Sequence, residues 1–196
     1  MMKITPLFSK PLIELNIDID TKNIEKTFKR FELEKHNNSS LTRLSVDKKV
    51  LDKFKKLKKV FYQVLNDVNS RVWKLNKELM ITTSWLTQTH PRGESAQHNH
   101  LNSLISGVFY FEDSSPISFS QPVSNTIYDA PSEYNVYNST DWKVSPKRND
   151  LILFPSELNH KIEKNNTDNI RYSLAFNVLP KGVLGYKDSI IKIGEI

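Results

Sequence analysis

Residues 170–179 read Ile-Arg-Tyr-Ser-Leu-Ala-Phe-Asn-Val-Leu, and large apolar side chains alternate there with small or polar ones. A period of two predicts a strand with one buried face, because successive side chains of a strand point to opposite sides of the sheet. Arg171 is the one large residue on the polar face, which it shares with Ser173, Ala175 and Asn177. Such small neighbours leave room for its planar guanidinium to enter a cavity and grip a carboxylate. The alternative is an outward Arg171 that meets solvent or pairs with an acid on the next strand.

The rest of the chain beyond residue 78 also predicts short strands. The segments expected to be strands are 80–87, 105–112, 117–120, 134–137, 150–154, 160–164 and 170–179. Prolines such as Pro116, Pro146 and Pro155 fall between them. Short strands at this spacing are typical of a double-sheet jelly roll or a β-barrel, so the fold class is mainly β.

The first 77 residues show a different pattern. Residues 11–17 are expected to form a strand and residues 21–34 a helix, and a polar loop at 35–40 precedes a long helix over 46–77. Apolar positions of the long helix, from Val50 and Leu51 to Val72 and Leu75, recur every three or four residues, which indicates one buried face. We expect a single domain over 1–196, with a helical support region, 1–77, packed outside one sheet of a β core, 78–196.

The net charge of +6 and the isoelectric point near 9.3 raise the question of a nucleic-acid partner. Many lysines fall between Lys48 and Lys59, on the polar side of the long predicted helix. No base-reading motif accompanies them, so we interpret them as a solvated helix face and disfavour a nucleic-acid partner. The sequence leaves a homodimer open.

Composition limits the residue types that can bind a metal and the cell compartments that the chain can occupy. The chain has no cysteine, which removes disulfides and thiolate metal sites and leaves His, Asp and Glu as metal ligands. No apolar stretch approaches the ~18 residues of a membrane span, and residues 1–6 lack the apolar core of a signal peptide. We therefore expect a cytoplasmic protein without a membrane partner.

Three of the five histidines lie within a few residues of a predicted strand end. His98 and His100 are two residues apart, so in an extended segment they share a face and can reach one ion. His160 opens a later strand and can complete a three-ligand set that leaves other coordination positions open. Each histidine taken alone is more often structural or exposed than a ligand, but imidazole is the commonest metal ligand, and the grouping favours a metal site.

These residues, with their neighbours in the sequence, resemble the motifs of a known protein family. Residues 85–177 resemble the 2-oxoglutarate- and Fe(II)-dependent oxygenase superfamily, and most closely a subgroup that shares four short motifs. In this chain the motifs are Gln97-His98-Asn99-His100, Ser106-Gly107-Val108-Phe109-Tyr110, Phe154-Pro155-Ser156 before His160, and Arg171-Tyr172-Ser173. The motifs are specific as a set and weak singly, and residues 1–77 match only in being an upstream helical region.

The resemblance implies a double-stranded β-helix that binds Fe(II), 2-oxoglutarate and O2, and hydroxylates a small molecule or a peptide with release of succinate and CO2. It places His98 and His160 as iron ligands and His100 where the family has a carboxylate. Arg171 and Ser173 correspond to the residues that bind the distal carboxylate of 2-oxoglutarate. Tyr110 could donate to the same carboxylate, and the alternative is a buried tyrosine with an ordinary partner. Asn177 shares the face of Arg171 and is expected to line the same cavity.

His100 is a departure from the family pattern. Three neutral imidazoles would leave the iron one positive charge more than the usual ligand set does. Asn102 or water could take the position of His100 instead. The alternative function is a cupin-like metal-binding jelly roll without 2-oxoglutarate chemistry, and Arg171 discriminates between the two because a cupin needs no carboxylate-binding arginine there.

Overall fold

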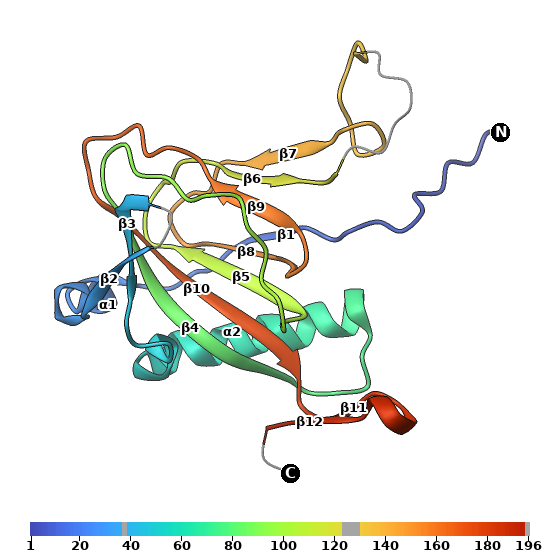
Figure 1. The fold of residues 1–196 in the computed structure, drawn as a ribbon, viewed down its shortest axis with the longest axis horizontal. Coiled ribbons are helices and arrows are strands. Elements are labelled where there is room, and N and C mark those ends of the chain that lie inside the picture. Colours follow the sequence, from blue (N-terminus) through green and yellow to red (C-terminus); the bar gives the residue numbers. More distant parts are fainter. Residues whose placement is uncertain (37–38, 123–129, 195–196) are drawn as a thin grey trace.

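The computed structural model describes residues 1–36, 39–122 and 130–194, and antiparallel strands dominate it (Figure 1). Seven strands form a major sheet in the order β1-β8-β5-β10-β4-β3-β2, and three form a minor sheet in the order β7-β6-β9. The strands are β1 Ile13–Asn16, β2 Leu33–His36, β3 Ser39–Ser45, β4 Leu79–Thr89, β5 Ile105–Tyr110, β6 Ile117–Ser120, β7 Asp141–Val144, β8 Asp150–Pro155, β9 Asn159–Ile162, β10 Arg171–Pro180, β11 Gly182–Leu184 and β12 Ile191–Ile193. The last two form a separate hairpin, and the other two sheets make the jelly roll.

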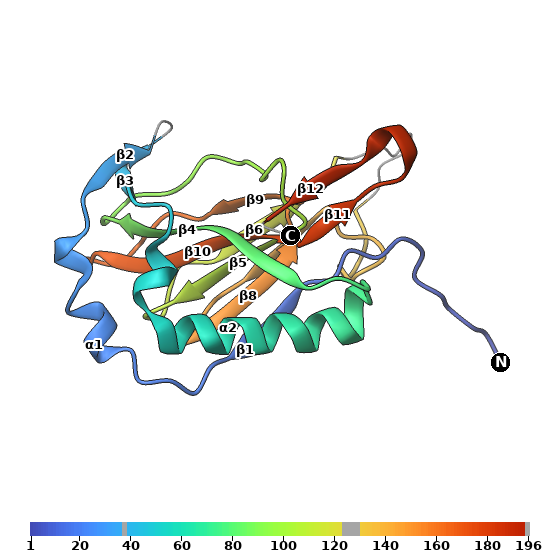
Figure 2. The ribbon, with the colours of Figure 1, turned by 90° about the horizontal axis from the view of Figure 1, so that it is seen from below.

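Alternation along the central strands creates two cores. In β10, Leu174, Phe176 and Val178 belong to one apolar cluster, and Ala175 belongs to a second cluster on the opposite face. Strands β5 and β8 divide their side chains between the same two clusters. The first cluster lies between the major sheet and α2 (Lys55–Val68), which runs along one face of the sheet (Figure 2). The second cluster, which contains Tyr110, lies between the two sheets.

The long helix expected over 46–77 is divided in the structure. A 3₁₀ helix, Val50–Lys53, comes first, then α2, and then a π-helical turn, Asn69–Trp73. The first division has a tertiary cause, because the backbone N–H of Leu51 donates to the Ser84 hydroxyl at 2.9 Å and ties this turn to β4. The helical run ends after the π-helical turn at Lys74, whose conformation is left-handed (φ 51°). No described helix is long and apolar enough to cross a membrane.

The helix expected over 21–34 is wrong for most of its length. Residues Lys22–Glu25 form the short helix α1, Phe28–Arg30 form a 3₁₀ turn, and β2 begins at Leu33. Strand β2 pairs with β3, and β3 with β4, so hydrogen bonding to a distant strand overrides the local helical period. The segment 1–77 is therefore not only a helical support, because it adds β1, β2 and β3 to the major sheet. The predicted loop at 35–40 falls largely on β2 and β3, and its residues 37–38 lie outside the described residues.

Downstream of residue 78 the structure confirms the expected strands, with one exception. The strand predicted over 134–137 is wrong, because residues 136–138 form a turn and the next strand, β7, begins at Asp141. The Asn138 side chain stabilises this turn by accepting a hydrogen bond from the Asn135 N–H at 2.7 Å. The face assignment of β10 is confirmed, since Arg171 is buried on the side of Ala175.

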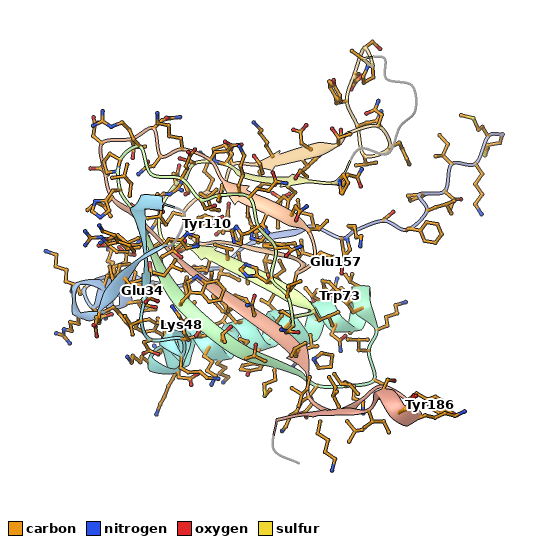
Figure 3. All side chains as sticks on the ribbon, viewed as in Figure 1. Glu34, Lys48, Trp73, Tyr110, Glu157 and Tyr186 are labelled. Atoms are coloured by element: carbon orange, nitrogen blue, oxygen red, sulfur yellow. The ribbon has the colours of Figure 1, made fainter. Side chains whose placement is uncertain are left out.

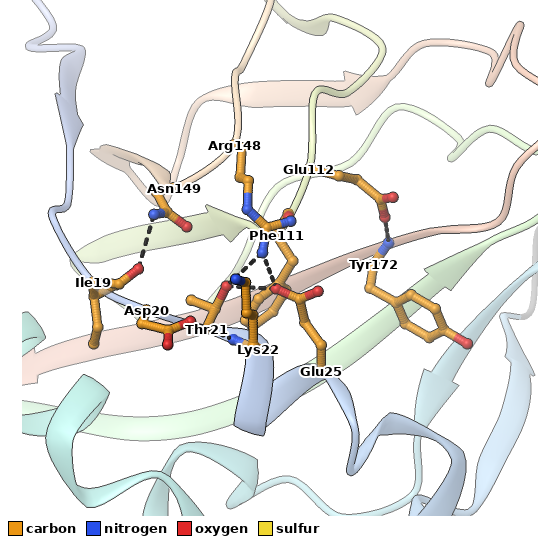
Figure 4. Close-up of polar contacts among 10 residues, drawn as sticks. All are labelled: Ile19, Asp20, Thr21, Lys22, Glu25, Phe111, Glu112, Arg148, Asn149 and Tyr172. Atoms are coloured by element: carbon orange, nitrogen blue, oxygen red, sulfur yellow. Dashed lines mark hydrogen bonds and ion pairs between the residues drawn. The ribbon is translucent and has the colours of Figure 1, made fainter.

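Arg148 joins residues 21–25, at and in the short helix α1, to the jelly roll (Figure 4). Its guanidinium donates to the Phe111 carbonyl, pairs with Glu25 and donates to the Thr21 hydroxyl, the last at 2.9 Å. Beside it, Glu112 accepts a hydrogen bond from the Tyr172 N–H at 2.6 Å. These contacts fix the ends of β5 and β10 next to Arg171.

Candidate metal centre

Two chain segments bring three histidines together. His98 and His100 lie between β4 and β5, and His160 lies in β9; one potential ligand atom from each ring lies within 4.8 Å of the other two. The backbones of His98 and His160 form an antiparallel bridge with hydrogen bonds of 2.9 and 2.8 Å. Directly opposed residues of such a bridge point to the same side. The bridge therefore explains how residues 62 positions apart, 160 minus 98, present their rings to one point.

Backbone carbonyls orient two of the three rings. Nδ1 of His98 lies 2.8 Å from the Ala96 carbonyl oxygen, and Nδ1 of His160 lies 2.9 Å from that of Leu158. A carbonyl oxygen can only accept, so each Nδ1 carries the proton and each Nε2 keeps a free electron pair for a metal. The backbone N–H of His100 donates to Ser156 at 2.9 Å, but its ring makes no hydrogen bond to any described residue.

Burial keeps the rings of His100 and His160 neutral. Burial, together with the smaller effect of the nearby His98, lowers the pKa of His160 to about 3 and that of His100 to about 4. Phe154 and Phe119 flank His160, with ring centroids at 4.7 and 6.2 Å, and these apolar rings account for the dry surroundings. Neutral imidazole is the form that binds a metal ion, so these rings need no deprotonation at pH 7.

Arg171 and Tyr110 form a second polar feature, and Tyr110, labelled in Figure 3, belongs to the apolar cluster between the two sheets. They lie on the neighbouring strands β10 and β5, and both are buried, with Arg171 only 6% exposed. Nη1 of Arg171 donates to the Ser114 hydroxyl at 3.0 Å, whereas Nη2 and the Tyr110 hydroxyl have no partner among the described residues. Burial lowers the pKa of Arg171 and raises that of Tyr110. A guanidinium keeps its charge in proteins, and the raised pKa keeps the Tyr110 hydroxyl protonated at pH 7. Two buried donors without acceptors are suited to an anionic oxygen ligand.

The other two predicted cavity residues lie at different points along β10. Ser173 is directly opposite Tyr110, close to the unpartnered donors. Asn177 is instead opposite Ser106, whose hydroxyl donates to it at 2.9 Å and also contacts Ser156 at 2.8 Å. Asn177 thus belongs to a polar network with Ser106 and Ser156, and the Ser156 carbonyl accepts the backbone hydrogen bond of His100. The structure does not group Asn177 with Arg171 and Tyr110.

Sequence reasoning missed two residues near these features. Ser114 contacts Arg171 but follows β5 in a polar run that carries no recognisable signal. His36, at the end of β2, brings a fourth imidazole whose centroid lies 6.4 Å from that of His98. Its segment was predicted as a loop, and only the pairing of β2 with β3 places it there.

Comparisons with known proteins show a family match for part of the chain and a fold that solved structures share. Residues 83–177, just under half of the chain, match the family described as "Putative 2OG-Fe(II) oxygenase". No curated protein matches in sequence. Among solved structures, HygX from Streptomyces hygroscopicus, with nickel, 2-oxoglutarate and hygromycin B bound, is 12% identical at a TM-score of 0.63, covering 87% of this chain and 83% of its own.

Two further solved structures have a similar fold. A 2OG-Fe(II) oxygenase family oxidoreductase from Burkholderia pseudomallei is 11% identical, with a TM-score of 0.63 and coverage of 85% and 84% of the two chains. A prolyl hydroxylase from Trichoplax adhaerens, in complex with a hypoxia inducible factor peptide fragment, is 10% identical, with a TM-score of 0.61 and coverage of 85% and 82%. Residues 83–177 thus match a 2-oxoglutarate- and Fe(II)-dependent oxygenase family, and solved oxygenases share the fold of the chain.

Proposed function

We propose that this protein is an Fe(II)- and 2-oxoglutarate-dependent dioxygenase that hydroxylates an unactivated C–H bond of a small molecule or a peptide. The observation that carries the proposal is the pair of buried, unpartnered donors, Arg171 Nη2 and the Tyr110 hydroxyl, in the same interior as the three histidines. A metal-binding jelly roll of the cupin kind accounts for the histidines, but it gives no reason to bury an arginine with half of its fork unpaired.

The three histidines fit an iron ion. His98, His100 and His160 would hold it through ring nitrogens, and the carbonyls of Ala96 and Leu158 would keep two of the rings in the metal-binding tautomer. Because all three ligands are neutral, the site would keep the full charge of the ion, which favours an anionic cosubstrate over a neutral one.

The donor pair fits the distal carboxylate of 2-oxoglutarate. Arg171 Nη2 and Tyr110 would each donate to that carboxylate, and Ser173, opposite Tyr110, would add a third donor. Ser114 would hold the other half of the arginine fork in place. Bound together, iron and 2-oxoglutarate would supply the oxidation, in which R–H, O2 and 2-oxoglutarate give R–OH, succinate and CO2.

The protein's own contribution is orientation and exclusion of water. Phe119, Phe154 and Trp85 surround the histidines with apolar surface, which keeps the interior dry and strengthens its charge interactions. The solved structures of similar fold contain hygromycin B in one case and a peptide in another, so both a small molecule and a peptide are consistent with this fold as substrate.

Anaerobic titration of the Fe(II) protein with 2-oxoglutarate tests the proposal. We expect the visible metal-to-ligand charge-transfer band of the chelate to appear, and slow formation of succinate when air is admitted without substrate. Absence of both the band and succinate would leave the cupin-like alternative.

Paired variants then test the individual roles. Arg171→Ala should retain iron and weaken 2-oxoglutarate binding by about 10- to 100-fold, since a charged hydrogen bond contributes about 1.5–3 kcal/mol. Arg71→Ala is the matched control, because Arg71 is an exposed arginine outside the jelly-roll interior. A loss of iron from Arg171→Ala, or an equal effect of Arg71→Ala, would argue against the assigned role.

A further inference from the structure

A row of paired residues crosses the minor sheet and starts at the candidate metal ligands. His98 is bridged to His160, His160 is opposite Phe119 in β6, and Phe119 is opposite Trp142 in β7. Directly opposed residues of antiparallel strands project from the same face of a sheet. The Trp142 indole therefore projects from the face that carries His160, toward the interior of the jelly roll.

Exposure changes abruptly along the inner face of the minor sheet. Phe119 is 5% exposed, and the neighbouring row of Ile117 and Val144 is also buried, whereas Trp142 is 43% exposed. Trp142 lies on β7, the outer strand of this sheet, and no further described strand pairs with it (Figure 1). The apolar wall that surrounds the histidines thus ends at a half-exposed indole, where the interior meets solvent.

We propose that Trp142 is a substrate-binding residue that stacks against a planar ring of the substrate. The inference rests on the proposed function, because it assumes that the substrate reaches the histidines. An exposed indole offers a large, flat, rigid surface that prefers another ring in an offset or edge-on arrangement. Phe119, between Trp142 and His160, supplies apolar surface for the part of the substrate that joins the two points.

The position of Trp142 also sets the size of the substrate. Two strand spacings of about 4.8 Å separate the backbone of Trp142 from that of His160, which amounts to roughly 10 Å. A molecule that reaches from the reacting carbon near His160 to a ring on Trp142 must span a comparable length. A free aliphatic amino acid is too short, and the ring-bearing substrates that fit are a peptide with an aromatic side chain or a polycyclic small molecule.

Fluorine NMR of the full chain labelled with 5-fluorotryptophan tests this inference, with indole as the probe. Trp73, Trp85 and Trp142 give three resonances, which Trp→Phe variants assign. With Zn(II) and 2-oxoglutarate bound, indole at millimolar concentration should shift the Trp142 resonance in a saturable manner and leave Trp73 unchanged. Trp142→Ala should weaken indole binding by about five- to tenfold, as expected for the loss of an aromatic pair.

Replacement of Zn(II) by paramagnetic Co(II) then locates the probe. Protons of indole stacked on Trp142 should broaden, because the ring would lie roughly two strand spacings from His160. Tyr186→Ala is the control, since Tyr186 is an exposed aromatic residue beside the separate β11–β12 hairpin. Tyr186→Ala should leave both the shift of the Trp142 resonance and the broadening of the indole protons unchanged.

The inference is overturned if indole leaves the Trp142 resonance in place, if Trp73 shifts equally, or if Co(II) fails to broaden a probe that does bind at Trp142. None of these readings requires oxygen or turnover. A failed charge-transfer titration would reject the proposed oxygenase, whereas the shift of the Trp142 resonance by indole reports on the Trp142 surface whether or not the added Zn(II) and 2-oxoglutarate bind.

Discussion

At the residue scale, the two buried donors without described partners, the Tyr110 hydroxyl and Arg171 Nη2, destabilise the ligand-free protein. An unsatisfied buried hydroxyl destabilises a fold by about 1–3 kcal/mol, and Tyr110 is almost wholly buried with its hydroxyl unpartnered among the described residues. Tyr110→Phe removes the hydroxyl and keeps the ring. We expect the free energy of unfolding of the metal-free protein to rise by about 1 kcal/mol, as measured by urea denaturation.

The same variant should lose affinity for 2-oxoglutarate. One donor to the distal carboxylate is gone, so binding should weaken by about tenfold in the anaerobic titration, with iron content unchanged. A gain in stability together with a loss in affinity is the combination that a site built for a ligand predicts. If Tyr110→Phe destabilised the metal-free protein, its hydroxyl would have a structural partner and its role at the site would have to be abandoned.

The three histidines should not contribute equally to metal binding. The rings of His98 and His160 are fixed by backbone carbonyls, and the ring of His100 has no comparable hydrogen bond among the described residues. His98→Ala and His160→Ala should abolish Co(II) binding in calorimetry. His100→Ala should retain weaker binding, because the two rings that the backbone carbonyls orient remain as ligands. Complete loss in all three variants would make His100 an equal ligand.

At the element scale, β5 needs a glycine at its centre. A Cβ on Gly107 would lie 2.7 Å from Leu153 Cδ2 and would collide with the Phe176 ring, which stacks on Phe61 of α2 at 5.0 Å. The glycine therefore allows α2 to pack closely on the sheet. Gly107→Ala should lower the free energy of unfolding by about 1–3 kcal/mol, as measured by urea denaturation, because the core is overfilled.

A second substitution checks this explanation. Phe176→Leu removes the ring that the new methyl group would meet, so in Gly107→Ala/Phe176→Leu the two costs should be less than additive. Additive costs would show that the effect of Gly107→Ala comes from β5 itself and not from the contact with Phe176.

At the scale of the whole molecule, ligands should join parts of the fold that are far apart in sequence. The histidines come from the segment before β5 and from β9, and the donor pair comes from β5 and β10. At a metal concentration of about 100 times the dissociation constant, binding adds about 2.7 kcal/mol of stability. For a chain of this size the melting temperature should rise by roughly 5–10 °C.

Addition of 2-oxoglutarate to the metal-loaded protein should raise the melting temperature again, as measured by differential scanning calorimetry. In Arg171→Ala the metal should still give its increase, and the second increase should be smaller. The assigned ligand sets would be contradicted if the metal did not raise the melting temperature of the wild-type protein. They would also be contradicted if 2-oxoglutarate raised the melting temperature of Arg171→Ala as much as that of the wild-type protein.

The sequence by itself determined the inward face of β10, the three clustered histidines and the jelly-roll strands beyond residue 78 except β7, which was misplaced at 134–137. These features depend on local signals, namely a period of two, interrupting prolines and histidines at strand ends. The helix at 21–34 was predicted from the same kind of signal and was wrong for most of its length, because a helical period does not reveal the pairing of β2 and β3. The helix at 46–77 was predicted correctly for most of its length, but its division at the hydrogen bond from Leu51 to Ser84 was not.

Only the tertiary structure decided which side chains lack partners and which meet across strands. The unpaired fork of Arg171, its contact with Ser114 and the row from His98 to Trp142 join residues that lie tens of positions apart. Register between distant strands sets these contacts, and a shift of one residue would turn Trp142 to the opposite face. The sequence therefore determined which residue types were present for metal and carboxylate binding, and the packing of two sheets decided where they face one another.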